Sequence, residues 1–149
     1  MDYKIAGEEA LRDAYKSNPG RGSYTVVRPG GLSDKPSTGA KGVEVSQGDI
    51  LSAEIGREDV AEVAVAALIS DKTKDATIEC YGAKGEIMFG TVSGASKLAK
   101  GLPKVEGKFV HRAESWEGLF EGVLNDEEMV KTGIVGGYKG KDIEPIENL

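Results

Sequence analysis

The stretch Ser23-Tyr24-Thr25-Val26-Val27-Arg28-Pro29-Gly30-Gly31-Leu32 decides the predicted fold. Its β-branched and aromatic residues, 24–27, predict a short buried strand. Residues 28–31 end that strand, because proline has no N–H for a ladder and glycine allows positive φ. In an α/β sheet, the turn after a strand's carboxyl end is where a ligand can approach the main chain, although the same turn can be a plain connector.

A helix is predicted before this strand, over residues 2–16. Small and apolar side chains recur there at helical spacing and form one face: Tyr3, Ala6, Gly7, Ala10, Leu11 and Ala14. Because these side chains are small, we expect this face to lie close against a sheet. Residues 17–22 contain Pro19 and two glycines, which end the helix. Helix, turn and strand together predict the second half of a βαβ unit.

The same alternation continues up to Gly82. Residues 33–42 predict a surface loop, residues 43–45 a short strand, and residues 47–49 a turn. Residues 57–69 give the clearest helical pattern, with one apolar stripe: Val60, Val63, Ala64, Ala67 and Leu68. A polar turn over 71–75 and an alternating strand over 76–81 follow. This order predicts half of an α/β sheet.

Glycine becomes frequent after Gly82, which predicts two parts: a sheet-forming domain, residues 1–82, and an extended tail with short helices, residues 83–149. The tail contains an apolar stripe at helical spacing: Trp116, Leu119, Phe120 and Val123. Asn125 and the acidic residues after it predict the cap and first turn of a further helix that ends at Gly133. The stripe either folds back onto its own domain or docks on a partner protein, and our hypothesis is the partner.

Composition excludes several classes of function. The net charge is −6, with 25 acidic against 19 basic residues and no basic cluster, which argues against nucleic-acid binding. One cysteine, Cys80, and one histidine, His111, cannot form an internal disulfide or a zinc-ligand set. No signal-like opening and no run near the ~18 apolar residues of a membrane span is present. We expect a soluble chain, or one that reaches a membrane only through a partner.

Three stretches carry a resemblance to a known family: residues 4–8 on a helix, residues 24–32, and residues 56–63. In this order they resemble the C-terminal half of atypical short-chain dehydrogenase/reductases, the NmrA-like NAD(P)-binding Rossmann proteins, and most of all the plant and algal plastid members. The resemblance covers roughly residues 2–82. It implies the fold class α/β, with the C-terminal part of a Rossmann-like parallel sheet and flanking helices.

The resemblance also implies a cofactor site. Lys4 matches the helix lysine that hydrogen-bonds the nicotinamide ribose, and Pro29, Gly30 and Gly31 match the main-chain turn beside the nicotinamide. An ammonium group can donate to ribose hydroxyls, and glycine lets a ring approach the backbone. The cofactor would be NAD or NADP, provided that the N-terminal half of the fold is supplied. The residue that selects between the two belongs to that half.

Two parts of the family pattern are missing from the sequence. The catalytic tyrosine would stand four residues before Lys4, ahead of Met1, and no other tyrosine is followed by lysine at that spacing. The Gly-rich turn that binds a pyrophosphate is also missing, because residues 90–101 have the wrong spacing and follow the last strand of the resemblance. We therefore predict no catalytic residue in this chain, and we expect the sheet to be completed by strands from elsewhere.

Three functions remain open. The first is a non-catalytic, Rossmann-derived accessory subunit that docks within a larger assembly, such as a plastid photosynthetic or a respiratory membrane complex, with a cytoplasmic location as the alternative. The second is a fragment of an NAD(P)-dependent oxidoreductase or of an NAD(P)-sensing protein. The third is an independent small binding domain without a nucleotide.

Overall fold

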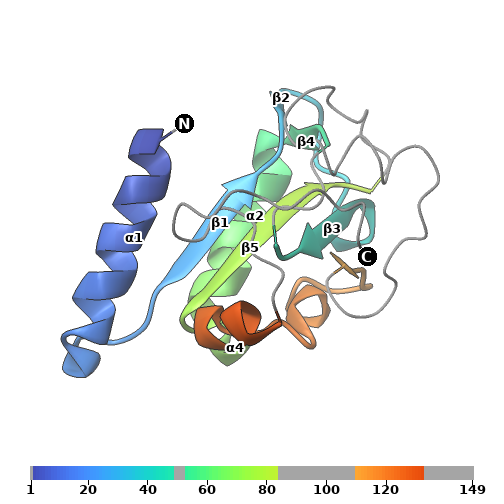
Figure 1. Cartoon of the computed structure of the whole chain (residues 1–149). Helices are drawn as coiled ribbons and strands as arrows, with labels where there is room; N and C mark the ends of the chain where they lie inside the picture. Colours follow the sequence, from blue (N-terminus) through green and yellow to red (C-terminus); the bar gives the residue numbers. More distant parts are fainter. Residues whose placement is uncertain (1, 49–52, 84–109, 133–149) are drawn as a thin grey trace.

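The computed structural model describes residues 2–48, 53–83 and 110–132 (Figure 1). Helix α1 (Asp2–Lys16) and helix α2 (Arg57–Ile69) confirm the two helices predicted from periodicity. The strands are β1 (Thr25–Pro29), β2 (Leu32–Ser33), β3 (Val43–Ser46), β4 (Ile55–Gly56), β5 (Ala76–Gly82) and β6 (Val110–His111). The short helices are η1 (Pro19–Arg21), η2 (Ala40–Gly42), η3 (Asp71–Thr73), η4 (Glu117–Phe120) and α4 (Asp126–Lys131).

The main sheet has the strand order β1-β5-β3-β6, and β2 pairs with β4 separately. Strands β1 and β5 run parallel, as a crossover through α2 allows, so the predicted α/β fold class is confirmed. The sheet is not parallel throughout, because β3 runs antiparallel to both β5 and β6. The sequence could not predict this direction, since the alternation of a four-residue strand is the same either way.

Strand β1 is an edge strand among the described residues: it pairs with β5 on one side only. The carbonyl of Tyr24 accepts from the N–H of Asp75 at 2.8 Å, and the N–H of Gly30 donates to Cys80 at 2.9 Å. Even-numbered backbone groups therefore face β5, and the alternation of a ladder turns those of Thr25, Val27 and Pro29 outward. We call these outward groups the β1 edge. Proline suits this position, because its missing N–H breaks no ladder bond.

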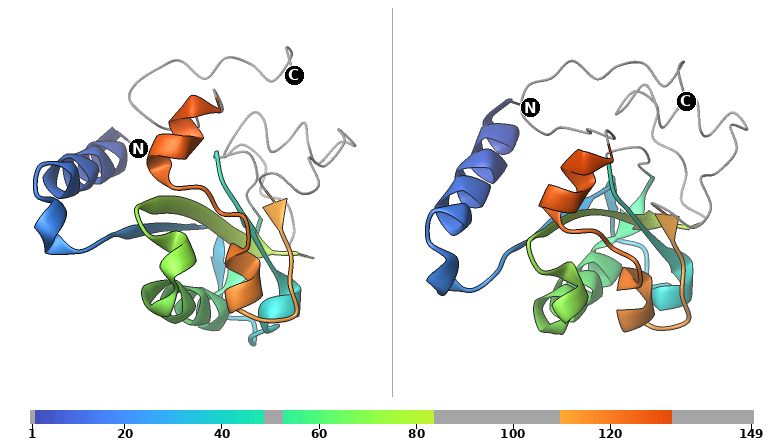
Figure 2. Two further views of the ribbon diagram at one scale, coloured as in Figure 1. Left: turned by 90° about the horizontal axis from the view of Figure 1, so that it is seen from below. Right: turned by 60° about the horizontal axis from the view of Figure 1, so that its bottom comes forward.

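The apolar core lies on one face of the sheet, where α2 and η4 cover it (Figure 2). Fully or nearly fully buried side chains come from the strands, from α2 and from η4: Val43, Val45, Ile78, Cys80, Val63, Ala67, Leu119 and Phe120. Helices α1 and α4 lie on the other side of the sheet. Both views show α1 standing beside β1, apart from the rest of the body.

Residues 110–132, the C-terminal segment, are bonded to the sheet through Gln47, which is fully buried. Its Nε2 donates to the carbonyl of Leu124 at 2.8 Å, and its Oε1 accepts from the N–H of Leu124 at 2.9 Å. Asn125 caps α4 and forms a capping box with Glu128, which confirms the predicted cap. The predicted end at Gly133 lies outside the described residues. The division of the chain after Gly82 stays a prediction.

The orientation predicted for α1 is wrong. The small apolar face does not lie against the sheet: Tyr3 is 94% exposed, and Ala6, Gly7, Ala10 and Ala14 are exposed with it. The helix instead turns Glu8 and Arg12 toward the sheet, where both form ion pairs. These charged contacts fix the rotation of the helix, because rotating α1 by half a turn would break them. No helix in the described part of the chain is both long and apolar enough to cross a membrane.

Candidate functional site

The four residues predicted to contact a dinucleotide lie at one end of the structure. Helix α1 runs antiparallel to β1, and Glu8 of α1 pairs with Arg28 of β1 at 2.6 Å. Lys4 lies one helical turn before Glu8, and Pro29 follows Arg28 directly. The structure therefore brings Lys4 and residues 29–31 to the carboxyl end of the parallel strands. This is the end at which ligands bind in open α/β sheets.

A row of charges crosses the sheet next to this end. Arg28 donates from Nε and Nη2 to both oxygens of Glu8, at 3.1 and 2.6 Å, and from Nη1 to Glu79 at 3.4 Å. The side chains of Arg28 and Glu79 are 17% and 5% exposed. Burial alone would raise the pKa of the Glu8 carboxyl, but Arg28 and then Arg12 outweigh it and hold this pKa below its usual range.

A second buried polar network holds the other half of α1. Arg12 donates from Nε to Asp126 at 2.8 Å and from Nη2 to the hydroxyl of Thr77 at 2.7 Å. The hydroxyls of Tyr24 and Thr77 donate to the same Asp126 oxygen at 2.9 and 3.0 Å. Burial, and then the charge of Asp126, raise the pKa of Tyr24, so this phenol stays protonated and remains a donor.

Lys4, Glu8 and Arg12 follow one another at a spacing of four residues, so they share one face of α1. Glu8 and Arg12 use this face to contact the sheet. Lys4 lies on this face one turn closer to the N-terminus than Glu8, toward the carboxyl end of β1, and it is exposed. Its contact with a nicotinamide ribose stays a prediction.

Gly30 lacks a side chain for a reason within the chain itself. A Cβ on Gly30 would lie 1.9 Å from the carbonyl oxygen of Ala53, and Gly31 accepts a hydrogen bond from Ile55 at 2.8 Å. Residues 53–55 therefore pack directly on the turn after β1. The Pro29 side of the turn is exposed and Gly31 is half-exposed, so the main chain there can still be approached from outside. Cofactor contact at residues 29–31 stays a prediction.

The four residues predicted to bind a partner lie against this chain's own core. Leu119 and Phe120 are 0% exposed, and Trp116 and Val123 pack on the same cluster while partly buried. The structure thus corrects the partner hypothesis for Leu119 and Phe120, because a side chain with no exposed surface cannot reach another protein. The structure instead agrees with the alternative, in which this stripe folds back onto its own domain.

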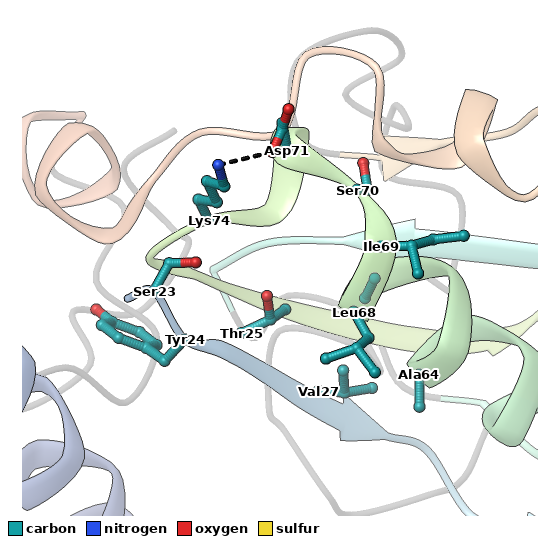
Figure 3. A pocket seen from close by; sticks show the side chains of 11 residues that line it. Ser23, Tyr24, Thr25, Val27, Ala64, Leu68, Ile69, Ser70, Asp71 and Lys74 are labelled. Carbon is teal, nitrogen blue, oxygen red and sulfur yellow. Dashed lines mark ion pairs between the residues drawn. The ribbon is translucent and has the colours of Figure 1, made fainter. Parts of the chain in front are cut away.

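A hollow of about 300 Å³ lies alongside β1, between that strand and α2 (Figure 3). The side chains of Thr25 and Val27 line it from β1, and those of Ala64, Leu68 and Ile69 from α2. Leu68 and Ile69 are 84% and 80% exposed. Leu68 belongs to the predicted apolar stripe, but the sequence did not predict this hollow. Apolar residues on several sides of α2 were a signal for it, because they are typical of a helix covered on more than one face.

The sheet face opposite the core carries buried polar residues that the sequence analysis did not predict. Glu44, Ser46, Thr77, Glu79 and Tyr81 are each at most 4% exposed. Burial, followed by the charge of Glu44, raises the pKa of Tyr81. Their alternation along two strands would ordinarily indicate a face in water. No three metal-ligating side chains gather as a metal site in the ranges that the structure covers, and the Gly-rich residues 90–101 lie outside those ranges.

In a comparison with protein families, residues 3–71 fit the family model described as NAD(P)H-binding. The matched range contains α1, β1 and α2, and with them Lys4 and residues 29–31. It supports a Rossmann-type NAD(P)-binding domain in this part of the chain. The C-terminal segment lies outside it. No curated protein matches the chain.

Proposed function

We propose that this chain supplies the second half of an NAD(P)-binding Rossmann-type domain and acts as a non-catalytic accessory subunit, docked in a larger assembly that completes the sheet. The β1 edge is the observation that carries this proposal. Backbone groups of Thr25 and Val27 face outward from a strand whose other side is parallel to β5. Parallel strands are normally paired and covered on both faces.

Apolar surface borders the β1 edge on the α2 side, where Leu68 and Ile69 stand exposed at the hollow. An open parallel edge beside exposed apolar side chains is prone to aggregate in isolation. We therefore infer that a strand with apolar residues on the α2 side pairs with Thr25 and Val27, and that pairing stops at Pro29.

We assign one end of a dinucleotide to the described residues. Lys4 would hold the nicotinamide ribose, and the main chain of residues 29–31 would lie beside the ring. A bound nicotinamide supplies a hydride donor or acceptor. The described residues include no glycine-rich phosphate turn, so we assign the pyrophosphate to the completing part of the domain.

A second candidate function is a fragment of an NAD(P)-dependent oxidoreductase or of an NAD(P)-sensing protein. The observation in its favour is that Lys4 and Pro29 lie at the same end of the sheet. Sequencing the transcript upstream of the Met1 codon separates the two. A reading frame that continues upstream and encodes a glycine-rich turn supports the fragment, and an in-frame stop codon supports a separate subunit.

The resemblance to plant and algal proteins supports a plastid location, with a photosynthetic complex as the assembly and a cytoplasmic location as the alternative. A fluorescent fusion of the full chain in plant cells tests this part. Signal confined to the cytoplasm would contradict a plastid location. It would not affect the proposal that a further strand pairs with the β1 edge, which is tested separately.

Nucleotide binding tests the proposed site. We expect the purified chain to bind no NADPH by fluorescence titration, and the assembled protein to bind it saturably. In the assembled protein, Lys4→Met should weaken binding about tenfold or more, since a hydrogen bond from a charged group contributes ~1.5–3 kcal/mol. Lys16→Met, in the last turn of the same helix, is the matched control and should leave the affinity unchanged. Equal affinity in the Lys4→Met protein would contradict the assignment of Lys4.

A further inference from the structure

We propose that Asp126 of α4 is a positioning residue for Lys4. Through Arg12, it would hold α1 at the place where Lys4 reaches the end of β1, so that the C-terminal segment sets the geometry of the nucleotide end. This inference rests on the proposed function of Lys4. Asp126 lies outside the matched residues 3–71, and the sequence pattern indicated only a first-turn acid.

Among the described residues, polar contacts attach helix α1 to the body. Its small apolar face is turned away from the sheet, which removes the contact that usually holds a helix on a sheet. The described contacts include the Glu8–Arg28 and Arg12–Asp126 ion pairs and the hydrogen bond from Arg12 to Thr77. The rings of Tyr15 and Tyr24 add an edge contact, with centroids 5.4 Å apart.

Asp126 is itself held firmly. It is 6% exposed, and its Oδ2 accepts from Arg12, Tyr24 and Thr77 at 2.8, 2.9 and 3.0 Å. Its backbone N–H donates to the carbonyl of Asp75 at 2.8 Å. The carboxylate is therefore bonded to Tyr24, just before β1, and to Thr77 of β5, and the backbone of Asp126 is bonded to the turn between η3 and β5. A partner fixed from three directions defines where the guanidinium can lie.

The position of the Arg12 side chain determines the position of Lys4, because both residues belong to one rigid helix. Arg12 and Lys4 are two turns apart on one face, about 12 Å along the axis at 1.5 Å per residue. Glu8, paired with Arg28, stands between them. One anchor alone would leave the helix free to swing about it, whereas two anchors a turn apart set both its direction and its rotation. Removing the Asp126 charge should therefore displace Lys4 although Asp126 is on another element.

Hydrogen exchange of the full chain tests the anchor directly. In Asp126→Asn, amides of residues 2–16 should exchange about tenfold faster or more, which corresponds to ~1.4 kcal/mol of lost local stability, while β5 keeps its protection. Arg12→Met should reproduce this pattern if Asp126→Asn fails to fold. Asn125→Ala, the matched control, removes the cap of α4 but keeps Asp126, and should leave α1 protected. Unchanged exchange in α1, or the same increase in Asn125→Ala, would overturn the proposal.

Nucleotide affinity of the assembled protein separates this proposal from the proposed function. Asp126→Asn should weaken NADPH binding when Lys4 is present and have no further effect in a Lys4→Met background. A role in general stability would weaken both backgrounds equally, and that result would overturn the positioning role. If Lys4→Met alone has no effect, the proposed function fails at Lys4, while the exchange experiment still decides whether Asp126 anchors α1.

Discussion

Arg28 and Glu8 join strand β1 to helix α1, with Arg28 Nη2 2.6 Å from Glu8 Oε2. The same guanidinium reaches the nearly buried Glu79 of β5. One side chain thus connects the helix that carries Lys4 with both parallel strands. These ion pairs determine which face of α1 contacts the sheet.

Arg28→Met should destabilise the chain by about 3 kcal/mol, because removing one member of a largely buried ion pair leaves its carboxylate partners poorly compensated. Denaturant unfolding measures this difference in the free energy of unfolding. Arg57→Met is the matched control: its pair with Asp34 is exposed, with side chains 55% and 92% accessible, and should contribute less than ~1 kcal/mol. Equal losses in the two variants would show that Arg28 has no such role.

Gly30→Ala should destabilise the chain by ~1–3 kcal/mol or more, because the new Cβ would overlap the carbonyl oxygen of Ala53. Gly7→Ala is the opposite case. Apart from its chain neighbours and the nearby helix backbone, no atom lies within 4 Å of a Cβ there, and alanine in an exposed helix position stabilises by about 1 kcal/mol relative to glycine. Thermal unfolding of both variants tests whether the melting temperature falls in Gly30→Ala and rises in Gly7→Ala. A Gly30→Ala protein as stable as the parent would mean that the turn does not pack on residues 53–55.

Phe120→Ala should cost about 3–5 kcal/mol of folding free energy, since the ring is fully buried in the core. Val130→Ala, at an exposed apolar position of the same C-terminal segment, should change it by less than ~1 kcal/mol. The comparison also tests the earlier partner hypothesis for the stripe. A Phe120→Ala chain of unchanged stability that loses its assembly would favour docking on a partner over burial in the core.

His111 should titrate below its ordinary value of about 6.5, because burial disfavours the charged imidazole and lowers its pKa. It is the chain's one histidine, so a single proton NMR signal reports it. The neutral form is favoured in the folded state, so its contribution to stability is present above pH ~6.5 and is lost as the pH falls through that value toward the folded pKa. His111→Gln should remove this part of the pH dependence. A folded-state midpoint at or above 6.5 would contradict the burial of the ring.

The sequence predicted the fold where the signals are local. Helices α1 and α2 agree with their predicted ranges, and Asn125 caps α4 as expected, because periodicity and capping act within a few residues. The rotation of α1 could not be predicted in this way. It depends on ion pairs that join residues 20 and 114 positions apart in the chain, and no periodicity within the helix carries that information.

In the candidate site, too, the sequence predicted local features but not tertiary contacts. The turn at residues 29–31 was predicted from a strand that stops at proline and glycine, which is a local signal, whereas its contact with a cofactor was implied by the resemblance. The placement of Lys4 and Pro29 at the same end of the sheet and the pairing of Arg12 with Asp126 depend on tertiary contacts. The pattern of Leu119 and Phe120 is identical for a core stripe and for a docking surface, so only their burial distinguishes the two.

The central claim is that β1 is an open edge, completed by strands that this part of the chain does not supply. Residue-resolved amide exchange at Val27, with light scattering on the same purified sample, tests it most directly. We predict that Val27 exchanges much faster than its neighbours Val26 and Arg28 in the purified chain, and that it becomes protected in the assembled protein. A monomer by light scattering in which Val27 is as protected as its neighbours would contradict the claim.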